Sequence, residues 1–140
     1  MKKKPQKGMV FGVFDGLHEG HRHFLERAAR LCKELAVVVA TDETTVDLKG
    51  RMPTQPLAER IEAIQAFDAS YVVRPGDEVS GSWNILESEA PDIVFLGYDQ
   101  QNIEYELRDS GIPYIYMDAY EPDRFKSSRY RERGTTEGQP

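Results

Sequence analysis

The sequence predicts an α/β protein with a Rossmann-like, three-layer α/β/α architecture built on a five-stranded parallel sheet. Three observations favour this fold class: short apolar segments recur along the 140 residues, segments of helical periodicity separate them, and each apolar segment is hydrophobic along most of its length. Strands of that kind, alternating with helices, are typical of a parallel sheet covered on both faces. We therefore expect one compact domain over residues 8–133, with flexible termini at 1–7 and 134–140.

The expected strands are short and rich in β-branched and aromatic residues, as strands generally are. They cover residues 8–14, 35–41, 70–74, 92–97 and 113–117. Parallel sheets bind ligands outside the carboxyl ends of their strands, where the following helices begin. The most polar and glycine-rich junctions of the chain lie at those ends, and we expect the functional site there.

The expected helices alternate with these strands. The first, over residues 19–34, places apolar side chains on one face and charged side chains on the other. A second begins at Leu57, directly after a proline, which is a signal for a helix start. Two shorter helices are expected over 82–89 and 103–108, and Gly111 ends the last.

Composition excludes several classes of function. The net charge of −6 disfavours a large phosphate-neutralising surface, so we expect no nucleic-acid partner. No segment approaches the roughly 20 apolar residues that cross a bilayer, so we expect no membrane partner. The single cysteine, Cys32, cannot form an internal disulfide, fits a buried helix position and favours a cytoplasmic location. A homodimer is left open.

The segment GVFDGLHEGH, residues 12–21, carries the strongest functional signal. It follows the first strand, and His18 and His21 fall on one side of the start of the next helix. Backbone N–H groups and the positive end of the helix dipole suit this position to phosphate. Two imidazoles there can donate hydrogen bonds to a phosphate whose charge rises in a transition state. Nucleotide-binding residues expected from the segment are Gly12, Val13, Phe14, Asp15 and Gly20.

The histidines have two other interpretations. A single histidine at a helix start can simply cap the helix, but the combination of glycines, aspartate and paired histidines after a strand favours a phosphate site. A metal site at the pair is disfavoured, because the only other histidine, His23, supplies no matching cluster. The metal ligands of the protein, if any, are left unknown.

The segment GVFDGLHEGH resembles the signature of the cytidylyltransferase-like nucleotidyltransferases. These enzymes transfer a nucleoside monophosphate from an NTP to a phosphorylated small molecule and release pyrophosphate. Three further segments are similar to the family and occur in its order: ATDETTVDLKGRMPTQPLAER, PDIVFLGYDQ and FKSSRYRER. The resemblance implies small-molecule substrates and Mg²⁺, or another divalent cation, bound with the NTP.

The resemblance of the segment ATDETTVDLKGRMPTQPLAER to the family implies catalysis by Lys49 beside the two histidines. It also implies acceptor binding by Asp42, Arg51 and Arg60. Lys49 and Arg51 flank Gly50 in what reads as a polar, mobile loop. A flexible cation there can close over a triphosphate, although a solvated basic loop is the alternative. Asp15 and Asp42 are open to three roles: solvated turn residues, supports for a histidine, or Mg²⁺ ligands.

The last two segments imply the rest of the nucleotide site. At the end of the fourth strand, a backbone turn with an aromatic face and polar edges can bind a base, although a plain surface turn is the alternative. A pair of serines at a helix start can hold the β and γ phosphates or merely cap the helix. The residues are Gly97, Tyr98, Asp99, Gln100, Ser127, Ser128 and Arg129.

Within the family, the runs LKGRMPTQPLAER and PDIVFLGYDQ, with the plain KSSR ending, resemble archaeal-type FAD synthases, which transfer AMP from ATP to FMN. The alternative is a CTP-dependent cytidylyltransferase acting on glycerol 3-phosphate or another polyol or sugar phosphate. Those enzymes usually carry a run Arg-Thr-Glu-Gly-Ile-Ser-Thr-Thr near the C-terminus, which is absent here. A third interpretation is a nucleotide-binding regulatory module without catalysis.

Overall fold

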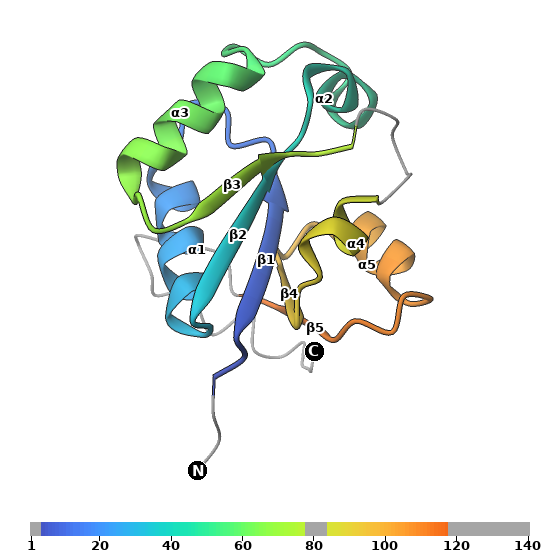
Figure 1. Ribbon diagram of the computed structural model, residues 1–140. Helices are drawn as coiled ribbons and strands as arrows, with labels where there is room; N and C mark the ends of the chain where they lie inside the picture. Colours follow the sequence, from blue (N-terminus) through green and yellow to red (C-terminus); the bar gives the residue numbers. More distant parts are fainter. Residues whose placement is uncertain (1–3, 78–83, 118–140) are drawn as a thin grey trace, which may run out of the picture.

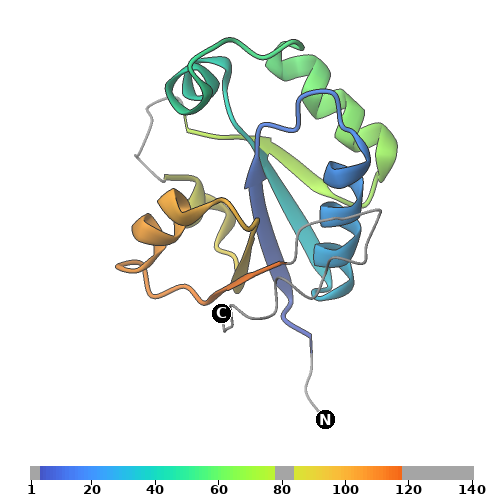
Figure 2. The same ribbon diagram turned by 180° about the vertical axis from the view of Figure 1, so that it is seen from behind.

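The computed structural model describes residues 4–77 and 84–117, and these form the α/β sandwich expected from the sequence (Figures 1 and 2). A five-stranded sheet has the order β3-β2-β1-β4-β5, and every neighbouring pair is parallel. The strands are β1 (Lys7–Gly12), β2 (Glu34–Val39), β3 (Val72–Pro75), β4 (Ile93–Leu96) and β5 (Tyr114–Tyr116). The predicted fold class is therefore confirmed.

The described helices are α1 (Glu19–Arg30), α2 (Asp42–Lys49), α3 (Leu57–Phe67), α4 (Asn84–Glu89) and α5 (Gln101–Leu107). The apolar core consists of two clusters, one on each face of the sheet. Side chains of α1 and α3 pack against one face of the sheet, and side chains of α4 and α5 pack against the other. Helix α2 belongs to neither layer and lies beyond the end of the sheet where β3 finishes (Figure 1).

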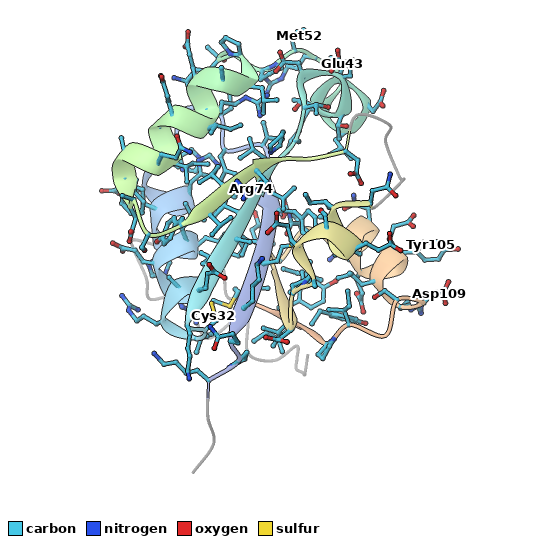
Figure 3. The ribbon with its side chains drawn as sticks, in the orientation of Figure 1. Cys32, Glu43, Met52, Arg74, Tyr105 and Asp109 are labelled. Carbon is cyan, nitrogen blue, oxygen red and sulfur yellow. The ribbon has the colours of Figure 1, made fainter. Side chains whose placement is uncertain are left out.

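The core explains the apolar character of the strands β1, β2 and β4. In β1, the central strand, Met9 and Val10 point to opposite faces, and both are fully buried. A strand covered on both sides by helices must be apolar along its length, because successive side chains face opposite layers. Cys32 packs in the cluster under α1 and is buried as expected (Figure 3), but it follows the end of α1 at Arg30 and does not lie on the helix.

Several boundaries differ from the sequence-based expectation. Helix α1 ends at Arg30, earlier than predicted, because Glu34 already begins β2. Helix α2 was not predicted, since its sequence DETTVDLK is short and contains threonine and valine, which are weak helix formers. It is instead fixed by its two ends, where Thr41 caps the N-terminus and Gly50 adopts the left-handed conformation at the C-terminus.

Within the described ranges, no helix is both long and apolar enough to cross a membrane. The expected C-terminal boundary of the domain, near residue 133, lies outside the described residues.

Candidate active site

The turn between β1 and α1 is held in an unusual conformation. Phe14, Gly16 and Leu17 have positive φ values of 54°, 82° and 35°. Such values are uncommon for residues with a side chain, and here the side chains of Phe14 and Leu17 are both buried. A Cβ atom on Gly12 would lie 2.8 Å from the ring of Phe14. The glycine at position 12 is therefore needed for the turn to close over its own strand.

The two histidines form a capping box at the head of α1. The Nδ1 atom of His18 accepts a hydrogen bond from the backbone N–H of Gly20 (3.1 Å), and the Nδ1 atom of His21 accepts one from the backbone N–H of His18 (3.2 Å). The rings stack with 3.7 Å between their centroids and an angle of 16°. Because each Nδ1 is an acceptor, each neutral ring carries its proton on Nε2. The pair thus offers two Nε2–H donors.

Gly20 permits this arrangement. A Cβ atom at position 20 would lie 3.1 Å from Cε1 of His18, which is tighter than an ordinary contact. The sequence predicts Gly20 as a nucleotide-binding residue. The structure adds a second reason for the glycine, which is the space taken by the His18 ring as it caps the helix.

His21 is neutral at physiological pH. Burial, which is the largest cause, and the neighbouring His18 lower the pKa of His21 to about 4, while Asp15 opposes the shift. The rings of Phe14 and His21 form a T-shaped contact, with 5.5 Å between their centroids. A neutral imidazole can stabilise developing negative charge by donating a hydrogen bond from Nε2.

The low pKa of His21 gives a prediction that NMR can check. We expect the His21 ring signals to stay constant from pH 8 to about 5.5 and to titrate near pH 4. The unfolded chain takes up this proton near pH 6.5, so the folded state loses stability as the pH falls from 6.5 towards 4. A His21 midpoint near 6.5 would show that the ring is not desolvated as the structure indicates.

Asp15 ties the histidine turn to the segment before α3. Its Oδ2 atom accepts from the backbone N–H of Thr54 (2.8 Å), and its Oδ1 atom accepts from that of Gln55 (3.0 Å). Gln55 also contacts the turn through its side chain, whose Oε1 atom accepts from the backbone N–H of Gly16 (3.1 Å). The bond from Thr54 is the largest cause that lowers the pKa of Asp15. These bonds give Asp15 a role that was not among the three left open, which is to hold the histidine turn against the segment before α3.

Arg60 is not placed to bind an acceptor, which corrects the sequence-based prediction. Its side chain is fully buried and makes four hydrogen bonds of 2.6 to 2.9 Å. The guanidinium donates to the carbonyls of Val13, Ala40 and Gln55 and pairs with the Asp42 carboxylate. The carboxylate of Asp42, also predicted to bind the acceptor, is engaged in this ion pair. The pair joins the ends of β1 and β2 to α2 and α3. It therefore holds the backbone segments around the site in place and does not contact a ligand directly.

A cavity of about 960 Å³ lies at the carboxyl ends of the strands and brings most of the predicted site residues together. Its volume is within the range of small-molecule and cofactor sites. Asp42 and Arg60 do not line it. The predicted residues that do are Gly12, Val13, Phe14, Asp15, His18, Gly20, His21, Lys49, Arg51, Gly97, Tyr98, Asp99 and Gln100.

Lys49 differs from its expected setting. It is the last residue of α2 and is exposed, so it sits on a helix end and not in the predicted mobile loop. Its positive charge is near enough to contribute to the lowered pKa of His21. Arg51 follows the helix and is also exposed in the cavity wall. Both cations therefore face the space in front of the histidines.

The turn after β4 contains one residue that holds the strands together and two whose side chains are exposed. Gln100 donates from Nε2 to the carbonyl of Phe11 (2.9 Å) and accepts at Oε1 from the N–H of Gly97 (2.9 Å), so its amide links β4 to β1. Tyr98 and Asp99 are exposed. Tyr98 and Asp99 are thus the residues of this turn whose side chains are available to a ligand.

Ser127, Ser128 and Arg129, expected to hold phosphates, lie outside the described residues. The cavity also has walls that the sequence analysis missed. They come from the unpredicted helix α2, from the end of β3 and from α4 and α5, and they include Thr44, Leu48, Gly76, Asp77, Ile85, Asn102 and Glu106. Only Gly76 and Asp77 had a sequence signal, since they belong to a polar junction after a predicted strand.

Among the described residues, no group of three or more histidine, cysteine, aspartate or glutamate side chains is arranged to hold a metal ion.

The parallel sheet, with paired histidines at the head of its first helix and exposed cations in the cavity wall, fits a nucleotidyltransferase. The chain belongs to the cytidylyltransferase-like family, whose model matches residues 9–133.

Curated relatives cover most of the chain. The FAD synthase of Pyrococcus horikoshii is 36% identical over 141 residues, which span 91% of this chain and 90% of that protein. The FAD synthase of Thermococcus kodakarensis is 36% identical over 146 residues, covering 94% and 93% of the two chains. The FAD synthase of Pyrococcus abyssi is 37% identical, covering 91% and 90%.

Solved structures agree with the fold. A lipopolysaccharide core biosynthesis protein from Thermoplasma volcanium superposes with a TM-score of 0.71 at 29% identity, covering 84% of this chain and 99% of that one. Pantoate-beta-alanine ligase from Francisella tularensis gives a TM-score of 0.59 at 15% identity, covering 86% and 62%. The second likeness supports the fold alone.

Proposed function

We propose that the protein is an FAD synthase, which transfers AMP from ATP to FMN and releases pyrophosphate. The observation that carries nucleotidyl transfer is the stacked histidine pair, which lines the cavity and has two Nε2–H donors. The likeness to FAD synthases over nine-tenths of the chain supports ATP and FMN as the substrates.

The reaction needs one displacement at phosphorus. A phosphate oxygen of FMN attacks the α-phosphorus of ATP, a new P–O bond forms, and the bond to the β-phosphate bridging oxygen breaks, so that pyrophosphate leaves with the electron pair. Negative charge grows on the transferred group and on the leaving group. The Nε2–H groups of His18 and His21 are suited to stabilise that charge, because both Nδ1 atoms accept backbone hydrogen bonds and leave Nε2–H as the donor.

The other assignments follow from position. Lys49 and Arg51, exposed in the cavity wall, would neutralise substrate phosphates. Tyr98 and Asp99 would contact the nucleoside, and Mg²⁺ would enter with ATP, because the described residues offer no cluster that would bind it alone. We place the reaction in the cytoplasm, as the single cysteine suggests.

A two-by-two assay tests the proposal. ATP or CTP is combined with FMN or glycerol 3-phosphate in the presence of Mg²⁺, and pyrophosphate release and FAD formation are measured. We expect turnover with ATP and FMN only, because a site that hydrogen-bonds one base edge leaves polar groups unpaired with the other base. Riboflavin is the matched control, since it lacks the attacking phosphate and should give no product.

The alternatives correspond to separate outcomes. Faster turnover of CTP with glycerol 3-phosphate would make the protein a cytidylyltransferase and refute the FAD synthase assignment. Binding of ATP that raises the melting temperature, without pyrophosphate release for any acceptor, would indicate the regulatory module.

A further inference from the structure

The sheet order separates the cavity into two sides. The histidine turn follows β1, the middle strand, whereas Tyr98 follows β4 on one side and Asp77 follows β3 on the other. A nucleotide whose base lies over the β4 end and whose α-phosphate reaches the histidines leaves the β2 and β3 side for the acceptor. That side is walled by α2 and α4.

Apolar side chains gather on this second side. Leu48 of α2 lines the cavity with 53% of its surface exposed, and Ile85 of α4 lines it half-buried. Phe11 and Val38, at the ends of β1 and β2, are also cavity-lining and buried. A leucine exposed within a binding cavity gains most by contact with an apolar ligand surface, since that contact removes it from water.

The cation beside Leu48 completes the pattern. Leu48 and Lys49 are the last two residues of α2, and both line the same cavity. The helix end therefore presents an apolar side chain and a positive charge side by side. FMN has the matching character, with a broad isoalloxazine ring at one end and a phosphate at the other. A polyol phosphate carries hydroxyl groups for which Leu48 and Ile85 provide no hydrogen-bond partners.

We propose that Leu48 and Ile85, which both line the cavity, bind the isoalloxazine ring of FMN and make the acceptor side selective for a flavin phosphate. This inference rests on the proposed function. It assigns a specificity role to α2 that is separate from nucleotide choice and from the histidine chemistry.

The test compares two serine substitutions on the same helix. Val46 is apolar and exposed like Leu48 but does not line the cavity, so Val46→Ser is the matched control for Leu48→Ser. Flavin binding is measured without ATP, by the change in FMN fluorescence, and KM is measured for FMN and for ATP. Melting temperatures show that the variants fold, as expected for exposed positions.

For Leu48→Ser we expect the Kd and KM for FMN to rise about tenfold, the low end for a lost apolar contact in a pocket. The KM for ATP should change by less than about twofold, and Val46→Ser should match the wild type in every measurement. An Ile85→Ser variant should weaken FMN in the same direction.

Three outcomes would overturn the inference: unchanged FMN affinity in Leu48→Ser, an equal rise in the KM for ATP, or an equal effect of Val46→Ser. In each of these, wild-type protein that still makes FAD leaves the proposed function intact. Wild-type protein that neither binds FMN nor makes FAD refutes the proposed function itself, and the inference with it.

Discussion

Replacing His18 or His21 with alanine is expected to lower kcat by about 100-fold or more, with a smaller change in the KM for ATP. Loss of a single hydrogen-bond donor aimed at transition-state charge typically has an effect of this size. The effect falls mainly on kcat because the charge on the transferred phosphoryl group is greatest in the transition state. Steady-state kinetics of FAD formation measure both parameters.

Alanine also removes the cap of α1, so a second substitution is needed to separate the two roles of His18. In His18→Asn, the side-chain Oδ1 can replace Nδ1 as the acceptor for the N–H of Gly20, but nothing replaces the Nε2–H donor. We expect His18→Asn to keep the melting temperature of the wild type and to lose activity like His18→Ala. If His18→Asn had both the melting temperature and the activity of the wild type, His18 would be only a helix cap.

Replacing Arg60 with methionine is expected to lower the free energy of unfolding by about 3–5 kcal/mol, the range for breaking a buried ion pair. Methionine fills similar space, but the carbonyls of Val13, Ala40 and Gln55 lose their donor, and Asp42 loses its partner. Unsatisfied polar groups in a buried position account for the size of the loss. Chemical denaturation of the two proteins measures it.

The control for this prediction is Arg51→Met, which removes an exposed arginine from the segment between α2 and α3. A surface substitution of that kind should change stability by no more than about 0.5 kcal/mol. If Arg60→Met instead unfolded like the wild type and raised only the KM for FMN, Arg60 would be the acceptor-binding residue that the family resemblance implied.

The sequence by itself determined the fold class and the position of the site. A continuous apolar run such as that of β1 indicates a strand that is covered on both faces. The pattern is local, so it can be recognised without knowing which other segments of the chain pack against the strand. The motif of residues 12–21 likewise holds its histidines and glycines in one turn. His18 and His21 could therefore be named together, because their spacing fixes their relation at a helix start.

Only the tertiary structure decided which polar residues face the cavity. Arg60 reads from the sequence as a helical cation near a phosphate site, but its partner Val13 is 47 residues away along the chain, and that contact closes it from water. Helix α2 placed Leu48 in the wall of the cavity. Burial and exposure at these positions result from packing between distant segments, and local sequence patterns carry no information about which distant segments meet.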